Sequence, residues 1–502
     1  MAQPIEELKK IRLEKLEKIQ KLGIDPFPAV SKRQQKIAQS LKMMGKKVTV
    51  AGRIVAMRGH GKIYFFDLLD ESGKIQIVFK FENFKGKKKE LFELLDIGDF
   101  IDVEGEVFKT KAGEISVLVN NFDFLAKSLR PLPSKWYGLK DVEERYRKRY
   151  LDLIINPGVK SVFEKRSLVI ASFREFLLEN GYYEVETPVL HPLYGGALAR
   201  PFKTYHNALG IPLYMRISTE LYLKRLIVGG FEKVFEVNKV FRNEGIDRQH
   251  NPEFTLLETM EAYIDYKKNM EITEKMIEYV VKKVNGSTKV SFQEQEIDFK
   301  TPWKRLTMVE AVKEYTGIDF DKVKDLKEAL KIAKDLGVKL DDYLSKNKGL
   351  ILAAIFEEKV EEKLIQPTFI CDFPIDTSPL AKKCEDNPLF VQRFEHYVAG
   401  MECSNNYSEL NNPLELEDRF KDERKKERLG DEEAHQTDTG FVEALEYGMP
   451  PTSGLGPSID RLVMILTNSP SIRDVILFPT LRPEGKVKDS GIRGDKEIKI
   501  KK

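Results

Sequence analysis

The sequence of 502 residues has few of the features that hold secreted or metal-stabilised domains together. Its three cysteines, Cys371, Cys384 and Cys403, form no CxxC pair, which argues against a zinc site and predicts a reducing compartment. No run of eighteen apolar residues is present, so a membrane-spanning helix is not expected. The N-terminus carries Glu6 and Glu7 early and lacks the apolar core of a secretion signal. These absences predict a cytoplasmic protein with no membrane segment.

The sequence also lacks a strong excess of either charge. Its 83 Lys and Arg residues nearly balance 80 Asp and Glu residues, for a formal net charge of +3. A protein coated by nucleic acid needs a larger basic excess, so any contact with RNA is expected at local patches. The length suits two or three domains, and a hydrophobic content of 41% is sufficient for their packed cores.

The first 130 residues predict a helix followed by a small β-barrel. Residues 1–45 include a basic amphipathic stretch, 4–22, in which apolar side chains recur at helical spacing: Ile5, Leu8, Ile11, Leu16 and Ile19. Two interpretations of this helix stay open, a solvated surface helix and a cationic contact for an RNA backbone. Residues 46–130 contain about five strand-like segments, the number found in OB-type barrels.

The rest of the sequence predicts a linker, a larger second domain and a tail. The expected bounds are 131–150 for a proline-containing linker, 151–485 for the second domain with a helical insertion at about 265–365, and 486–502 for the tail. The second domain opens with a helix from about 159 to 180, which Gly181 ends. Phosphate chemistry is not expected in the insertion. From Arg482 onward, eight Lys and Arg residues against four Asp and Glu residues make the tail weakly basic.

A charged loop between two strand-like segments is the most informative part of the second domain. The stretch 234–242 alternates with period two and 253–263 forms a second apolar limb, so two antiparallel strands are predicted. Arg242 and Glu258 then lie on one open surface. An arginine there can bind a phosphate through two parallel hydrogen bonds. A surface hairpin with solvated charges gives the same local pattern, and only the surrounding sequence separates the two interpretations.

That surrounding sequence resembles the three signature motifs of the class II aminoacyl-tRNA synthetases. Gly181–Pro188 is similar to motif 1, Phe241–Gly245 with His250–Phe254 to motif 2, and Gly454–Leu462 to motif 3. Further strings resemble the lysyl-tRNA synthetase family within this class: Gly23–Pro28, Gly195–Ala197 with Arg200–Phe202, Glu220–Leu226, Gln366–Phe369 and Tyr407–Asn411. Each string alone is weakly specific. Together they follow in order from Gly23 to Leu462, so the resemblance covers nearly the whole chain.

The resemblance implies an α+β fold in which an OB-type barrel that binds the anticodon precedes a class II catalytic domain, an antiparallel sheet flanked by helices. It also implies an ATP-dependent ligase. L-lysine would react with ATP to give lysyl-adenylate and pyrophosphate, and the lysyl group would then be transferred to the 3′ end of tRNA(Lys). Neither step requires a covalent enzyme nucleophile, only charge neutralisation and placement. The motif 1 region implies a homodimer interface.

The resemblance further implies roles for individual residues, with Arg242 and Arg461 as the catalytic arginines. ATP is expected to contact Arg242, Glu244, His250, Asn251, Phe254, Glu395, Glu402 and Arg461, and Mg²⁺ is expected at Glu395 and Glu402. Seven residues apart, these two acids share one helix face or lie on successive strands. Lysine is expected to contact Gly196, Glu220, Arg242, Glu258, Asn405, Tyr407 and Glu409, with Glu409 beside its ε-ammonium group. The anticodon is expected to contact Arg53, Phe65, Gln76 and Glu114.

The sequence departs from the family pattern at two positions. Met260 stands where relatives usually have a tyrosine that helps bind the lysine side chain, and Ser458 replaces the second glycine of motif 3. Neither change removes a charge. Three alternatives stay open. One is a synthetase of the aspartyl or asparaginyl type, whose aspartate-specific form needs a cation at the pocket floor. The others are a truncated relative that aminoacylates a protein, which lacks the barrel, and a catalytically weak relative with an RNA-binding or regulatory role.

Overall fold

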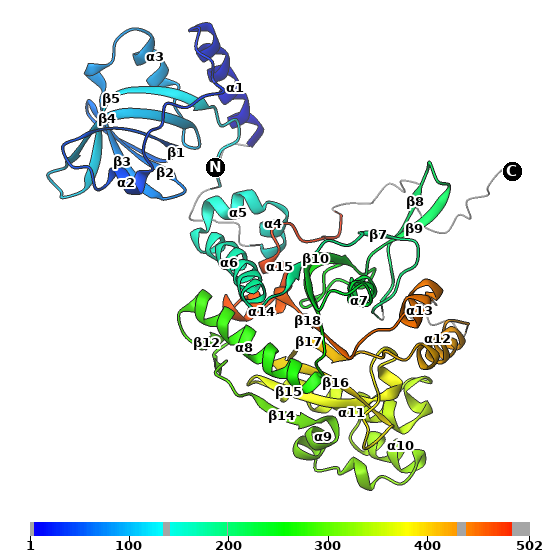
Figure 1. Ribbon diagram of the computed structural model, residues 1–502. Helices are drawn as coiled ribbons and strands as arrows, with labels where there is room; N and C mark the ends of the chain where they lie inside the picture. The colour runs from blue at the N-terminus through cyan, green and yellow to red at the C-terminus, as the bar shows by residue number, and fades with distance from the viewer. Residues whose placement is uncertain (1–4, 134–140, 198, 429–437, 484–502) are drawn as a thin grey trace. The chain divides into compact units, whose positions relative to one another are not determined.

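The computed structural model describes most of the chain: residues 5–133, 141–197, 199–428 and 438–483. The chain divides into two compact units, 1–140 and 141–502, and each is described by itself (Figure 1). The expected basic tail, 486–502, lies outside the described residues. Among the helices of the described ranges, none has both the length and the apolar composition needed to cross a membrane.

The first unit is a closed five-stranded barrel, which confirms the fold expected for this part of the chain. The strands follow the order β1–β2–β3–β5–β4, with the bounds β1 (Lys47–His60), β2 (Ile63–Asp70), β3 (Gly73–Lys80), β4 (Phe100–Lys109) and β5 (Ile115–Ala126). Alternating residues such as Ile77 and Phe79 fill its interior. The β2–β3 turn forms because the Asp70 carboxylate accepts hydrogen bonds from the backbone N–H groups of Ser72 and Gly73. Two short helices, α2 (Ile37–Ser40) and α3 (Lys87–Glu93), belong to the same unit.

Helix α1 (Ile5–Lys21) forms as predicted, but its inward face differs from the predicted apolar stripe. Ile19 is fully buried in the barrel core, whereas Ile5 is 57% exposed and Ile11 is 39% exposed. The inward face is completed by Arg12, which is only 9% exposed. A polar residue is suited to this position because barrel carbonyl groups face it, and such groups need hydrogen-bond partners where they are buried.

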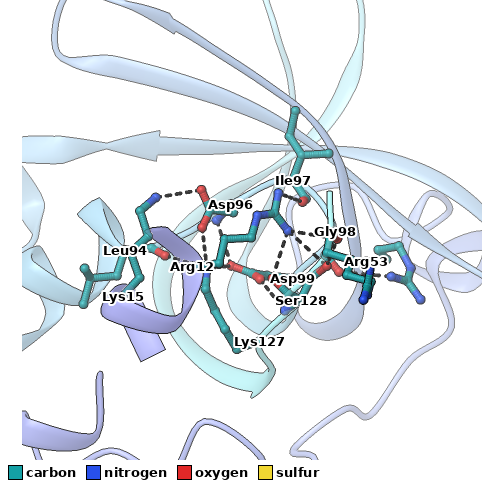
Figure 2. A network of polar contacts seen from close by, with 11 residues as sticks. Arg12, Lys15, Arg53, Leu94, Asp96, Ile97, Gly98, Asp99, Lys127 and Ser128 are labelled. Atoms are coloured by element: carbon teal, nitrogen blue, oxygen red, sulfur yellow. Dashed lines mark hydrogen bonds and ion pairs between the residues drawn. The ribbon is translucent and has the colours of Figure 1, made fainter. Parts of the chain in front are cut away.

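Arg12 joins α1 to two loops of the barrel (Figure 2). Its Nη2 donates to the carbonyl of Ile97 at 2.9 Å. Its Nη1 donates to the carbonyls of Ser128 at 2.9 Å and Arg130 at 3.3 Å. One guanidinium group therefore holds the helix, the loop before β4 and the end of β5 together.

A buried lysine stands beside Arg12 in the same network. The side chain of Lys127 is fully buried, with Nζ 2.6 Å from Asp96 and 2.8 Å from Asp99. Lys15 of α1 pairs with the other oxygen of Asp96 at 2.7 Å. Each buried charge has a partner of opposite sign, which is the condition for burying charge at low cost. α1 is thus part of the barrel structure, and a contact of its exposed lysines with RNA stays a prediction.

The second unit is built on an eight-stranded, largely antiparallel sheet, which confirms the α+β fold expected for the larger domain. The order is β14–β15–β16–β17–β18–β11–β10–β6, with the bounds β6 (Tyr183–Glu184), β10 (Lys233–Phe241), β11 (Glu253–Ala262), β14 (Lys304–Thr307), β15 (Thr368–Pro374), β16 (Phe390–Val398), β17 (Met401–Ser408) and β18 (Thr452–Pro457). The predicted hairpin is β10–β11, with Glu236 opposite Glu258. A small separate sheet, β7–β9–β8, consists of β7 (Leu190–His191), β8 (Lys203–His206) and β9 (Ile211–Met215).

Side chains alternate between the two faces of the large sheet. One face packs against three helices: α6 (Pro157–Glu179), α8 (Tyr266–Asn285) and α14 (Ile459–Leu466). Phe235 and Leu257 point into this core, whereas Val234 and Met260 belong to a second core. That second core includes two helices, α7 (Glu220–Val228) and α13 (Thr439–Glu446), and it leaves polar residues of the same strands free to line a cavity.

Motif 3 is the junction between β18 and α14, and Ser458 stands at the junction as the N-cap of the helix. Its φ of −76° lies outside the region that favours glycine, and its Oγ accepts a hydrogen bond from the backbone N–H of Arg461 at 3.3 Å. Serine is among the preferred N-cap residues. The departure from glycine therefore causes no backbone strain here, and it supports the first helical turn, which carries Arg461.

Two expected segments differ from the structure. The stretch 265–365 contains the helices α9 (Met308–Thr316), α10 (Leu326–Asp335) and α11 (Lys348–Lys359), but also α8, the hairpin of β12 (Lys289–Phe292) and β13 (Gln295–Asp298), and the edge strand β14. The expected linker, 131–150, is helical from α4 (Val142–Arg147) into α5 (Arg149–Ile155), while 134–140 lies outside the described residues. Arg149 stabilises the helical structure here, because its buried guanidinium donates to Asp152 at 2.8 Å and to the carbonyl of Leu477 at 3.1 Å.

Replacing Arg12 with alanine is expected to lower the stability of the first unit by roughly 1–3 kcal/mol, because three carbonyl groups lose a donor in a largely buried place. Urea unfolding followed by circular dichroism measures the change. Lys10→Ala, on the exposed face of the same helix, is the matched control and is expected to change stability by less than about 0.5 kcal/mol. Equal effects of the two substitutions would contradict the structural role of Arg12.

Candidate active site

A cavity of about 540 Å³ in the second unit brings together every predicted substrate, ATP and metal residue: Gly196, Glu220, Arg242, Glu244, His250, Asn251, Phe254, Glu258, Glu395, Glu402, Asn405, Tyr407, Glu409 and Arg461. These residues come from the segment between β7 and β8, from α7, from β10–β11 with its loop, from β16, from β17 with the residue after it, and from α14. The strands are neighbours in the sheet, so residues of one parity on each strand share one face. Whether each residue has its predicted role is a separate question, and the roles stay predictions.

Arg242 follows the last residue of β10 and lies at the centre of the cavity wall. Its Nε donates to the carbonyl of Ile217 at 3.4 Å, and its Cζ lies 5.1 Å from the ring centroid of Phe254. Neither Nη atom has a hydrogen-bond partner among the described residues. The guanidinium is therefore anchored through one nitrogen, and its two Nη atoms remain able to bind an anionic ligand, the role that stays a prediction.

The three acids predicted to bind the amino acid lie together at one end of the cavity. Glu258 is held by Ser218, whose Oγ donates at 2.6 Å, and by the backbone N–H of Thr219 at 2.5 Å. Burial raises the pKa of Glu258 despite these bonds. Glu220 begins α7, and the hydroxyl of Tyr407 donates to its Oε2 at 2.5 Å.

Lys224 is the residue at this end that the sequence interpretation missed. Its Nζ lies 2.6 Å from Oε1 of Glu220 and also forms an ion pair with Oε2 of Glu409. Even with this partner, burial raises the pKa of Glu409 to about 8. A signal was present, because Lys224 follows Glu220 by four residues and a helix brings such residues to one face. The spacing did not show that Glu409 would join them.

At two glycines in this region, neighbouring atoms lie too close to leave room for a Cβ atom. A Cβ on Gly454 would lie 2.5 Å from Oε1 of Glu409 and 2.8 Å from Cε of Met260. Gly196 has a φ of +85°, and a Cβ there would meet Ser218 at 3.0 Å. Met260 lines the cavity and also belongs to the second core, so its side chain has both a packing role and a place in the pocket.

The two predicted metal ligands lie on successive strands, Glu395 on β16 and Glu402 on β17, where Tyr397 pairs with Glu402. Arg393 and the hydroxyl of Tyr397 each donate to the Glu395 carboxylate. Burial raises the pKa of Glu395 to about 7, with the charge of Arg393 opposing and that of Glu402 adding to the effect. Arg461 donates to the backbone carbonyl of Glu402, with Nη1 3.7 Å from its Oε2.

The stretch expected to carry no phosphate chemistry contributes one acid to the cavity lining, and a second acid interacts electrostatically with Glu395 and Glu402. Glu357, on α11, lines the cavity. Burial and the charges of Glu402 and Glu395 raise the pKa of Glu361 to about 7. The expectation for this stretch stays a prediction, because a place at or near the cavity assigns no phosphate chemistry to an acid. Arg393, like Glu357, lines the cavity and was not named by the sequence interpretation.

This group of acids fits the expected magnesium site. Carboxylates that repel one another in a buried place are stabilised by a cation, and Mg²⁺ typically takes one or two carboxylates together with substrate phosphates. Among the described residues, no set of three or more His, Cys, Asp or Glu side chains is arranged as a complete metal cage. Glu395 and Glu402 are the two carboxylates expected to hold the ion, and that role stays a prediction.

The residues predicted near adenine lie along the β10–β11 loop. Nδ1 of His250 is 2.8 Å from Oδ2 of Asp247, so the ring is oriented by a carboxylate in the same loop. Nδ2 of Asn251 donates to the carbonyl of Glu253 at 2.5 Å, which uses part of its amide for the loop itself. Glu244 is exposed and lines the cavity with them.

The four residues predicted to read the anticodon lie in the barrel, but they do not all lie together. Nε2 of Gln76 donates to Glu114 at 3.1 Å, and the half-buried Phe65 lies on the neighbouring strand, where Asp67 is opposite Gln76. Arg53 is separate, since its guanidinium stacks on Phe100 with Cζ 4.2 Å from the ring centroid and donates to the carbonyl of Gly98.

Arg58 is the arginine that the β1–β2 register places opposite Phe65. It pairs with Asp67 at 3.0 Å, and its side chain is largely exposed. The anticodon role of Arg53 stays a prediction. A bulge in β1 between Ile54 and Ala56 places Arg58, and not Met57, opposite Phe65, so Arg58 is a second arginine of β1 to consider at this surface.

Comparison with known proteins finds a matching family for each of the two units. Residues 141–482 match the family described as tRNA synthetases class II (D, K and N), and residues 48–125 match the OB-fold nucleic acid binding domain. The chain is 53% identical over 485 residues to a lysine–tRNA ligase of Thermoanaerobacter pseudethanolicus, which covers 96% of this chain and 97% of that protein. It is 54% identical over 482 residues to a lysine–tRNA ligase of Clostridium novyi, covering 95% and 94% of the two chains. A lysine–tRNA ligase of Clostridium botulinum is 53% identical over 484 residues, covering 95% and 96%. The chain therefore belongs to the class II aminoacyl-tRNA synthetases, in the lysine–tRNA ligase family.

Proposed function

We propose that this protein activates L-lysine with ATP and transfers the lysyl group to the 3′ end of tRNA(Lys). The observation that carries the proposal is the division of one cavity into two ends. Glu220, Glu258 and Glu409 lie at the end formed by α7 and the last residues of β17, whereas Arg242 and Arg461 lie along the part that suits ATP. A cationic amino acid and an anionic nucleotide thus have separate, complementary surfaces.

Activation of the amino acid is a displacement at phosphorus. The carboxylate of lysine attacks the α-phosphorus of ATP, and pyrophosphate leaves. Arg242 is suited to hold the carboxylate and the α-phosphate together, because two of its nitrogens are open toward the cavity. Arg461 is suited to the terminal phosphate, and Phe254 offers an aromatic face for adenine.

Transfer to tRNA uses the same residues. A ribose hydroxyl attacks the carbonyl carbon of the adenylate, and AMP leaves with its phosphate still beside Arg242. A Mg²⁺ ion held by Glu395 and Glu402 would neutralise phosphate charge. The protein's own part is to place the reacting groups and to balance their charge.

The acidic pocket argues against an aspartate-specific enzyme. Such an enzyme needs a cation that is open to the substrate, whereas Lys224, the cation that contacts these acids, lies behind the cavity lining. Its charge is already used by Glu220 and Glu409. A negative pocket fits lysine, whose side chain ends in an ammonium group.

The barrel is proposed to bind the anticodon through the surface that carries Phe65, Gln76 and Glu114, with Arg58 beside Phe65. Aromatic rings and cations on such a barrel stack on bases and contact phosphates. A cytoplasmic location is also proposed, because the substrate tRNA serves protein synthesis.

A homodimer is proposed through the motif 1 region. Large apolar side chains are exposed in and around this motif: Leu168, Leu178, Tyr183, Val189, Leu190, Leu193 and Phe231. A group of exposed apolar residues of this size is typical of an interface with another protein.

Purified protein is expected to catalyse ATP–pyrophosphate exchange that depends on both lysine and Mg²⁺. Arg242→Ala is expected to lower the rate by roughly 100-fold or more, because it removes a charge placed at the reacting phosphate. Lys239→Ala, a cation of the same strand outside the cavity lining, is the matched control and should retain the exchange rate. Exchange stimulated by aspartate or asparagine and not by lysine would contradict the proposal.

Phe65→Ala is expected to reduce kcat/KM for tRNA(Lys) by roughly 5- to 150-fold, the equivalent of one lost base stack of about 1–3 kcal/mol. Pyrophosphate exchange without tRNA should be unchanged, since Phe65 belongs to the barrel and not to the catalytic unit. Both assays are run on one preparation with its melting temperature. A parallel loss in both assays would identify Phe65 as a core residue only.

The dimer is tested by sedimentation velocity. Leu178→Glu combined with Tyr183→Glu places two charges among the exposed apolar residues of motif 1 and is expected to shift the protein to a monomer. Leu414→Glu, on the exposed side of α12 (Pro413–Arg428), is the matched control and should leave the dimer intact. A wild-type protein that sediments as a monomer, or a double variant that remains dimeric, would refute this interface.

A further inference from the structure

Lys224 stands behind the amino-acid end of the cavity and does not line it. Its side chain is 1% exposed, which is unusual for a lysine. The rings of Tyr407 and Phe441 lie 5.4 and 5.8 Å from its Nζ and limit access of water. An ammonium group in such a place needs carboxylate partners, and it has two.

The partners of Lys224 are the two acids that also face the cavity. One oxygen of Glu220 and one oxygen of Glu409 contact its Nζ. The second oxygen of Glu220 accepts the hydroxyl of Tyr407. Both carboxylate oxygens of Glu409 are buried, and Oε2 is held by its ion pair with Lys224. Oε1 lies beside Gly454 and Met260, which line the cavity together with Glu409.

The charges at this end match those of lysine only because Lys224 is present. Glu220, Glu258 and Glu409 carry three negative charges when ionised, and Lys224 leaves two of them uncompensated. Lysine brings two ammonium groups, while its carboxylate is assigned to Arg242. An amino acid with a neutral side chain would leave a buried negative charge without a partner, which is costly.

We propose that Lys224 is a positioning and specificity-determining residue, which holds Glu220 and Glu409 in orientation and sets the charge of the pocket to that of the lysine dication. The inference rests on the lysine–tRNA ligase function proposed above. Without Lys224, two buried carboxylates would face each other. They would repel or take up a proton, and Glu409 would no longer present Oε1 to the substrate in a defined direction.

The test compares Michaelis constants in lysine-dependent pyrophosphate exchange. Lys224→Met removes the charge and keeps much of the volume. It is expected to raise KM for lysine roughly tenfold or more, as expected for the loss of a charge-assisted contact, and to change KM for ATP by less than about twofold. Lys224→Arg keeps the charge and is expected to recover much of the affinity for lysine. This split between the two substrates is not expected from a general loss of stability.

Lys127 provides a matched control. It is likewise a buried lysine between two carboxylates, Asp96 and Asp99, but it belongs to the barrel. Lys127→Met is expected to lower the melting temperature and to leave KM for lysine and for ATP unchanged in exchange without tRNA. A comparable rise in lysine KM from both substitutions would overturn the proposal, because buried-charge removal in general would then explain the effect.

Lys224→Gln is the second variant, since its amide still donates to one carboxylate and disturbs folding less. A folded Lys224→Gln or Lys224→Met protein with unchanged lysine KM overturns the proposal, and so does an equal rise in lysine and ATP KM. If neither variant folds while Lys127→Met does, Lys224 serves stability and the proposal is also overturned. A wild-type protein without lysine-dependent exchange refutes the proposed function itself, which separates that failure from failure of the inference.

Discussion

The catalytic unit depends on the antiparallel pairing of β10, β11, β18, β17 and β16. Hydrogen bonding between these strands sets their register, and the register decides which side chains share a face. Residues of one parity pack against α6, α8 and α14, and residues of the other parity form the cavity wall. A slip of one residue in β11 would move Glu258 into the apolar core and Leu257 into the cavity. The chemistry of the site is thus inseparable from the backbone pairing that builds the sheet.

Charge balance is the second constraint, and both units satisfy it in the same way. In the barrel, Lys127 is buried between Asp96 and Asp99. In the catalytic unit, Lys224 is buried between Glu220 and Glu409. The two differ in what the carboxylates do next. Asp96 and Asp99 also contact Lys15 and the backbone N–H of Ser128 and so stabilise a loop, whereas Glu220 and Glu409 line the cavity. The same local arrangement serves stability in one unit and, in our proposal, recognition in the other.

The sequence predicted the elements with strong local patterns. The barrel strands, α1, α6 and the β10–β11 hairpin have regular periodicity or clear turn residues, and they formed as expected. The sequence was less informative where a bulge of one extra residue changes the register between two strands. The bulge in β1 places Arg58, and not Met57, opposite Phe65. The predicted apolar face of α1 also differs from the structure, because Arg12 is buried against carbonyl groups that are distant in sequence.

The sequence by itself determined the family, the reaction and the residues that gather in the cavity, because motif strings fix residue type and order along the chain. Only the tertiary structure decided which charges meet. Glu220 and Glu409 are 189 positions apart, yet both contact Lys224. Glu361 lies in an insertion without a motif, yet it shares the electrostatic environment of Glu395 and Glu402. Such contacts arise when separate helices and strands pack on one sheet, and Coulomb interaction depends on distance in space and not along the chain.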